Sequence, residues 1–277
     1  MMPRPSALAA LLLLFAAPVF GQAQVTALSL LDAAIAEGRI TDAEEIIRRA
    51  PLEARDPELR LRQAEVALAA GRMAEAITGF GLLAEEPAVA ARANQGLGLA
   101  RLRRDQPDSA ATALDAALKL DPLLLRAWRA RGVAADKLRD WARAEAAYAA
   151  ALALAPGDAV TLSNRGWSRL IRGRAAEAEA DLLAALAADP GSTVVAGNLR
   201  LARAMQGHYE EAFTGSTREG LAGDLNSVGF AAMARGDHDV AEAYFNRALA
   251  LNPHFDRLAT ANLKWLAAAR SRATRPR

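Results

Sequence analysis

The sequence predicts an all-α fold, an α-solenoid of stacked helix–turn–helix units, and two observations support this prediction. First, 52% of the 277 residues are hydrophobic and 24% are charged, and good helix formers outnumber β-branched residues. Second, the chain repeats itself, because a shift of 34 residues brings three sets of small or helix-breaking residues into register. They are the glycines at 98, 132 and 166, the alanines at 110, 144, 178 and 212, and the prolines at 122, 156 and 190.

Residues 1–23 have the order of a signal peptide. Arg4 precedes an apolar run over 7–17, Pro18 breaks the run, and small residues follow at Gly21 and Ala23. A membrane-spanning helix needs about 20 apolar residues, so this run favours a cleaved signal over the alternative, an uncleaved anchor. Cleavage after Gly21 or Ala23 predicts a periplasmic or secreted protein with no integral membrane span after the signal is removed.

Composition argues against several classes of function. The chain has no cysteine, which excludes disulfides, thiolate metal ligands and a lipidated N-terminal cysteine. Its 34 basic and 32 acidic residues leave a net charge of +2, so we expect no nucleic-acid partner. No set of nucleophile, base and orienting group stands at a catalytic spacing, and the three histidines lie at separate turns. We therefore expect no enzymatic activity, no metal and no cofactor.

The clearest repeat covers residues 125–158, LRAWRARGVAADKLRDWARAEAAYAAALALAPGD. Its positions 4, 8, 20, 24, 27 and 32 carry Trp128, Gly132, Ala144, Tyr148, Ala151 and Pro156. This pattern resembles the tetratricopeptide repeat, and the resemblance implies a right-handed solenoid with a concave inner surface. Small residues at positions 8 and 20 let the paired helices approach closely, while the aromatic residues fill the space between helices.

The same frame divides the mature chain over residues 24–270. The units have approximate bounds of 24–56, 57–90, 91–124, 125–158, 159–192, 193–221 and 222–255, followed by a closing helix at 256–270 and a basic tail at 271–277. We expect Leu258, Leu263 and Leu266 to point inward from the closing helix. The unit at 193–221 is truncated, and its second helix should be short or broken because it contains two glycines. It is either a decayed repeat or a contact surface or hinge.

The resemblance also implies that positions 2, 5, 9, 12 and 13 of each first helix line the concave face. In the middle units these positions are largely basic, and in the C-terminal units they are largely apolar. This change indicates a partner segment that carries acidic residues beside apolar anchors. The alternative is that these side chains pack on the next unit, and that the asparagines at position 6 are structural. The candidate groove residues are Arg92, Arg126, Arg129, Asn164, Trp167, Asn198, Met205 and Phe230.

The predicted function is a non-enzymatic adaptor or scaffold that binds a protein or peptide in the cell envelope. The last third, NLRLARAMQGHYEEA, then NSVGFAAMARGDHDVAEAYFNRALALNP and ANLKWL, is similar in layout to the repeat protein of the Flp (Tad) pilus assembly system. That similarity implies an envelope complex that assembles a pilus or secretion machine. Two alternatives stay open: a purely structural, self-associating scaffold, and an enzyme or its regulatory subunit.

Overall fold

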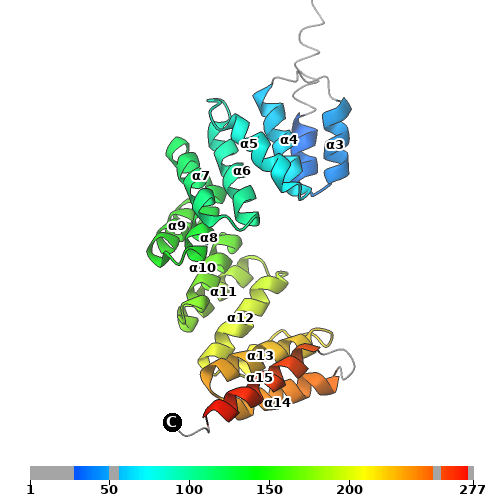
Figure 1. The fold of residues 1–277 in the computed structure, drawn as a ribbon, viewed down its shortest axis with the longest axis vertical. Coiled ribbons are helices and arrows are strands. Elements are labelled where there is room, and N and C mark those ends of the chain that lie inside the picture. The colour runs from blue at the N-terminus through cyan, green and yellow to red at the C-terminus, as the bar shows by residue number, and fades with distance from the viewer. Residues whose placement is uncertain (1–27, 50–55, 252–256, 274–277) are drawn as a thin grey trace, which may run out of the picture. The chain divides into compact units, whose positions relative to one another are not determined.

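The structure, a computed structural model, describes residues 28–49, 56–251 and 257–273 (Figure 1). Every regular element in these ranges is a helix, which confirms the all-α fold. The chain divides into two compact bodies, which we call the N-terminal body (to Asp140) and the C-terminal body (from Trp141). The predicted signal peptide at 1–23 and residues 274–277 of the predicted basic tail lie outside the described residues.

The N-terminal body is a stack of antiparallel helices. Each second helix packs against the first helix of its own pair and against the next first helix, as α5 does with α4 and α6. The helices are 28–36, α3 (Ile40–Arg49), α4 (Pro57–Ala69), α5 (Met73–Leu83), α6 (Ala90–Arg103), α7 (Pro107–Leu120) and α8 (Leu125–Lys137).

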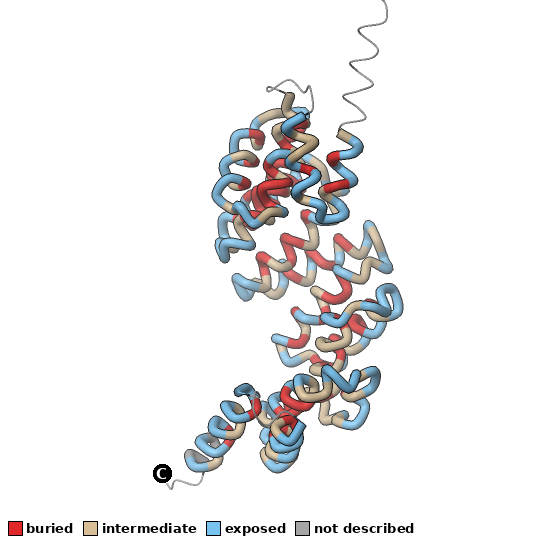
Figure 2. Tube along the Cα trace, turned by 90° about the vertical axis from the view of Figure 1, so that its right-hand side faces the viewer, coloured by how far each residue is buried: buried red, intermediate tan, exposed pale blue. Residues whose placement is uncertain are grey.

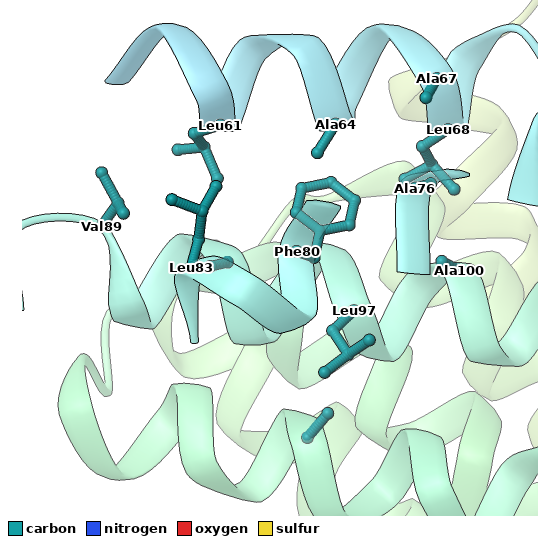
Figure 3. Close-up of a cluster of buried hydrophobic side chains, with 12 residues drawn as sticks. Leu61, Ala64, Ala67, Leu68, Ala76, Phe80, Leu83, Val89, Leu97 and Ala100 are labelled. Carbon is teal, nitrogen blue, oxygen red and sulfur yellow. The ribbon is translucent and has the colours of Figure 1, made fainter. Parts of the chain in front are cut away.

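The largest cluster of buried side chains in this body joins four helices, α4 to α7. Phe80 of α5 lies between Ala64 of α4 and Leu97 of α6, and its ring is fully buried (Figure 3). Gly96 of α6 provides the room, because a Cβ atom at that position would lie 2.4 Å from the Phe80 ring. A helical pair therefore buries its apolar face only when the next pair is present, which is the property of a repeat protein.

The C-terminal body continues the same arrangement with one interruption. Buried residues recur along the inner sides of its helices (Figure 2). Its elements are α9 (Trp141–Leu154), α10 (Ala159–Ile171), α11 (Ala175–Ala188), α12 (Thr193–Gln206), the 3-10 helix η1 (Glu211–Phe213), α13 (Leu221–Arg235), α14 (His238–Leu251) and α15 (Arg257–Ala273).

The glycines of the 34-residue period lie where two helices of a pair approach most closely. A Cβ atom would lie 2.5 Å from Leu114 at Gly98, 2.8 Å from Leu182 at Gly166 and 2.7 Å from Phe245 at Gly229. Small residues in this column are thus a packing requirement, as the sequence predicts.

The aromatic residues of the repeat differ in depth. Tyr148 and Phe245 are buried, in agreement with the prediction that they fill the space between helices. Trp128 is only half-buried: it packs against an apolar cluster of α7 and α8, and its indole N–H donates to the carbonyl oxygen of Pro122 at 2.9 Å.

After α12 the chain forms only the single turn η1 before α13 begins. Aromatic contacts occupy this region: the Tyr244 ring of α14 lies 6.1 Å from that of Tyr209 and 5.4 Å from that of Phe213. Arg200 of α12 also forms a half-buried ion pair with Asp224 of α13 at 2.8 Å. Because η1 is so short, α12 and α13 pack directly against each other.

The helix α15 packs on α13 and α14 (Figure 1). Ala259 and Leu266 are buried, and Leu263 packs against the same cluster as Leu266. The prediction for Leu258 is wrong, because 59% of this residue is exposed. The physical reason is helical periodicity: Leu258 stands one residue before Ala259, which turns it about 100° away from the buried side.

Ion pairs connect neighbouring repeats of the C-terminal body at a repeated position. A glutamate at position 21 of one unit accepts hydrogen bonds from an arginine of the following helix pair. The pairs are Glu145–Arg169 (2.8 Å), Glu179–Arg203 (2.9 Å) and Glu242–Arg270 (2.6 Å). Burial opposes ionisation of Glu145, but hydrogen bonds from Arg169 and Arg172 outweigh it and hold its pKa below the ordinary value.

Candidate functional site

The first helices of the C-terminal body present two matching rows of side chains. Position 6 of α10, α12 and α13 carries Asn164, Asn198 and Ser227, and position 9 carries Trp167, Leu201 and Phe230. Positions 6 and 9 lie on one side of a helix because they are three residues apart. We call these two sets the amide row and the apolar row.

The helix α15 extends both rows. Positions 3 and 10 are buried in α10 and α12, and Ala259 and Leu266 of α15 are buried at the same spacing. This alignment makes Asn262 the residue at position 6 and Trp265 the residue at position 9. The predicted closing helix therefore acts as the first helix of a further, incomplete repeat.

A cavity of about 430 Å³ lies between α12, α13 and α15. It contains two of the predicted groove residues, Asn198 and Phe230, and no charged side chain lines it. The full lining is Gly197, Asn198, Leu201, Asn226, Ser227, Phe230, Leu258 and Asn262.

One wall of this site is aromatic. The rings of Phe230 and Trp265 are stacked, with centroids 6.0 Å apart and planes at 25°. Both residues keep about half of their surface exposed, 44% for Phe230 and 52% for Trp265. The pair forms an apolar platform that is held in place before any ligand arrives.

A smaller cavity of about 200 Å³ lies between the N-terminal halves of α10 and α12. Val160, Asn164 and Val194 line it, so the structure places Asn164 at a cavity, as it does Asn198. Trp167 lies one turn further along α10 and is 44% exposed.

The amide row has unused hydrogen-bonding capacity. Among the described residues, the side-chain amides of Asn164, Asn198 and Asn262 have no hydrogen-bond partner within the protein, although all three side chains are partly buried. Each amide offers two donors and one acceptor. A ligand that supplies carbonyl oxygens and N–H groups could satisfy them.

Met205 is not among the residues that line the larger cavity. It packs against two buried clusters, one around α10, α11 and α12 and the other around η1 and α13. A residue at position 13 near the C-terminus of α12 meets α13 directly because the intervening helix is missing. Leu201 packs against the same two clusters and also lines the cavity, so the role of Met205 in the groove stays a prediction.

The predicted arginines lie in the N-terminal body and form a charged surface with two glutamates. Arg92 forms an ion pair with Glu58, which stands one repeat earlier. Arg126 is exposed and has no ion-pair partner among the described residues. Desolvation lowers the pKa of Arg126, and nearby Arg103 and Arg129 act in the same direction, whereas Glu65 opposes them. The predicted basic wall is therefore mixed in charge.

Glu65 is the residue on this surface that the sequence prediction missed. Burial raises the pKa of its carboxyl group, while Arg62, Arg92 and Arg126 act to lower it. The structure therefore brings Arg92 and Arg126 toward one carboxylate. The signal was present in the sequence, because Glu65 stands at position 9 of the unit 57–90.

The prediction also missed Leu258, Asn262 and Trp265. A sequence signal for two of them existed, since Asn164 and Trp167 have the same three-residue spacing as Asn262 and Trp265. One extra residue separates the last two units, so the fixed 34-residue frame does not align these two pairs.

Among the described residues, no group of three or more histidine or acidic side chains is placed to hold a metal ion. No helix among the described residues has the length and hydropathy to span a membrane.

Comparisons with known proteins agree with this geometry. Tetratricopeptide repeat models match residues 96–159 and 222–255. A chain of the APC/C Cut9–Hcn1 hetero-tetramer has a similar fold, with a TM-score of 0.63 and 16% identity over 85% of this chain and 48% of that one. This chain thus spans about half the length of that neighbour. A search of curated proteins finds no match.

Two smaller proteins are also similar in fold. A tetratricopeptide repeat protein from Parabacteroides merdae has a TM-score of 0.57 and 16% identity over 89% of this chain and 99% of its own. YrrB, a TPR protein with an unusual peptide-binding site, has a TM-score of 0.51 and 17% identity over 67% of this chain and 97% of its own.

The stacked helical pairs, the close-packing glycines and the rows on the first helices define an α-helical repeat protein. With the matching family models, they identify the chain as a tetratricopeptide repeat protein.

Proposed function

We propose that this chain is a non-enzymatic adaptor that binds a polypeptide segment of a partner protein on the first helices of its repeats. The observation that carries the proposal is the cavity of the C-terminal body that Asn198, Asn262 and Phe230 line. The amides of Asn198 and Asn262 have no partner among the described residues, and the Phe230 ring stacks on the exposed Trp265. The tetratricopeptide fold does not by itself supply catalytic groups, so the simplest use of this surface is to bind a partner.

Exposed apolar side chains support binding over a purely structural role. Trp167, Phe230, Leu258 and Trp265 each keep more than two fifths of their surface exposed. Soluble proteins seldom leave several large apolar residues together on one face unless a partner covers them. The peptide-binding site named for YrrB lies on a protein of similar fold, which is consistent with this use of the architecture.

We propose that the arginines of the N-terminal body make a second contact with the partner protein. Arg126 makes no direct ion pair among the described residues, although Glu65 acts on it electrostatically, and an arginine guanidinium pairs well with a carboxylate in direct contact. A partner segment with acidic residues would supply that carboxylate. Apolar residues of the same or another segment would occupy the cavity beside Phe230.

Export to the cell envelope is part of the proposal, and it rests on the leader-like residues 1–23. The setting we propose is an assembly complex for a pilus or secretion machine, on the similarity in layout of the last third. Mass measurement of the protein purified from the envelope fraction tests export. Loss of the residues before Gln22 or Gln24 is expected, and an intact Met1 would contradict it.

The binding test uses a matched pair of variants. The wild-type protein is immobilised, proteins captured from an envelope extract are identified, and the affinity of the purified partner is measured. Phe230→Ala should weaken it at least about tenfold, because buried aromatic anchors dominate interface energies. Leu183→Ala is the control, since Leu183 of α11 is equally exposed, at 43%, but lies outside both rows. Equal affinity of the two variants would contradict the proposed site.

The proposed contact between Arg126 and an acidic partner can be tested separately. Arg126→Glu reverses one exposed charge and should weaken binding of an acidic partner, mainly through slower association, and added salt should weaken the wild type as well. A scaffold that only self-associates would instead show a concentration-dependent size in the absence of any partner.

A further inference from the structure

We infer that the segment bound by the C-terminal body is proline-rich and lies on the two rows as a polyproline II helix. This inference rests on the proposed function and names the class of partner. It follows from four features of the rows: their unpaired amides, their lack of charge, their aromatic rings and their spacing.

The amide row requires a ligand whose backbone is accessible. An α-helix uses its own N–H and C=O groups internally, so it would leave Asn164, Asn198 and Asn262 unsatisfied. A polyproline II segment has no internal hydrogen bonds. Its carbonyl oxygens can accept from the amide Nδ2 groups, and proline does not need an acceptor in return because it has no N–H.

The rows carry no charge. Position 6 carries amides and one hydroxyl, and position 9 carries only apolar residues. Position 2, next to the rows, is also apolar in three of the helices, with Val160 in α10, Val194 in α12 and Leu258 in α15. The corresponding positions in α4 are Glu58, Arg62 and Glu65. Among the residues that line the two cavities, only Asp189 of the smaller one is charged. The surface therefore offers little to an acidic or basic side chain that would lose its hydration on binding. The segment on the C-terminal body is therefore neutral and apolar.

The apolar row supplies aromatic rings rather than a deep aliphatic pocket. Trp167, Phe230 and Trp265 are about half exposed, and the stacked Phe230–Trp265 pair forms a flat platform. Proline-rich segments dock on grooves lined by such rings because the polyproline II helix is preformed and loses little entropy on binding. A flat, preformed surface suits a stiff ligand of this kind.

The spacing of the rows matches the same conformation. First helices of neighbouring repeats contact each other along α10, α12, α13 and α15, and packed helices have axes about 8–10 Å apart. Three polyproline II residues rise about 9 Å and return to the same face. A β-strand instead rises about 7 Å over two residues, and after three it presents its opposite face. A Pro-Pro-X triplet can thus repeat one contact on each helix.

The test uses the full mature protein and a blocked peptide of about twelve residues built from Pro-Pro-Ala triplets, one triplet for each of the four helices. Calorimetry and tryptophan fluorescence measure its binding. Two control peptides replace every proline, one by alanine, which favours a helix, and the other by threonine, which favours an extended strand. The proline peptide should bind, with no dependence on ionic strength, and both controls should bind at least about tenfold more weakly.

Variants locate the site. Trp265→Ala and Asn198→Ala should each weaken binding of the proline peptide about tenfold or more, and Leu183→Ala should leave it unchanged. Asn198→Asp keeps the size of the side chain but removes its donor, so it should resemble Asn198→Ala. Circular dichroism confirms that each variant is folded.

The outcomes separate this inference from the proposed function. If the captured partner depends on Phe230 but the proline peptide neither binds nor competes, or if a control peptide binds equally well, the polyproline inference is wrong and the adaptor function stands. If Phe230→Ala does not affect the captured partner, the proposed binding site itself fails.

Discussion

Replacement of Gly98 by alanine tests the close approach of α6 and α7. The added Cβ atom would lie 2.5 Å from the Leu114 Cγ atom and 3.2 Å from the carbonyl oxygen of Ala110. Carbon atoms in contact prefer about 3.5–4.0 Å, so about 1 Å of extra space has to open. Leu114 is fully buried and has little room in which to move. The variant should therefore pay an overpacking cost of about 1–3 kcal/mol.

The matched control is Gly81→Ala. Gly81 is also helical, lies in α5 of the same body, and would place its new Cβ atom at least 4 Å from other side chains. Both variants gain helix propensity, by up to about 1 kcal/mol, so the difference between them isolates the packing cost. Urea unfolding followed by helical circular dichroism measures it. We expect Gly98→Ala to be less stable than Gly81→Ala by about 1–3 kcal/mol. Equal stability would mean that the glycine column is not needed for packing.

Three further predictions concern stability. Phe245→Ala removes a fully buried ring and should cost about 3–5 kcal/mol. Trp128→Phe keeps an aromatic ring but loses the hydrogen bond to the Pro122 carbonyl, about 1 kcal/mol, and part of the indole contact with its cluster, so its total cost should be smaller. Similar losses for the two variants would contradict the difference in burial. Because the pKa of Glu145 is lowered in the folded protein, its contribution to stability is present above its unfolded pKa, about 4.3, and is lost as pH falls through the lower folded value. Glu145→Gln should flatten that acid loss in a series of melting curves, and an unchanged pH profile would speak against the ion pair. Tyr209→Phe removes the hydroxyl group that donates to Asp237 beside η1 and should lower the free energy of unfolding by about 1 kcal/mol in the same urea assay, with no change expected if this contact does not form in solution.

The sequence predicted the repeat because the physics behind it is local. A pair of helices needs a small residue at their closest approach and a break after the second helix, and both requirements recur every 34 residues at Gly98 and Pro122 and their equivalents. The same frame placed Asn164, Asn198 and Phe230 on the first helices, and the structure places them at cavities.

The period alone did not place the side chains that depend on a change of register or on a neighbour. Asn262 and Trp265 join the two rows, and Leu258 lines the cavity beside them. They do so because five residues separate α14 from α15, one more than separate α11 from α12, which changes the frame of α15. Met205 packs where α12 meets α13 directly, a contact that the truncated repeat allows. Neither effect is visible in a fixed 34-residue frame.

Electrostatic partners were likewise decided by tertiary structure. The sequence supplied Arg92 and Arg126 as a basic pair, but only packing of α4 beside α6 brings Glu58 to Arg92 and lets both arginines act on the carboxyl group of Glu65. Composition and period determine which residues a repeat contains and which helix faces they share. Which charges meet depends on distances of a few ångströms between helices far apart in sequence, and the strength of an ion pair changes steeply with that distance and with its exposure to water.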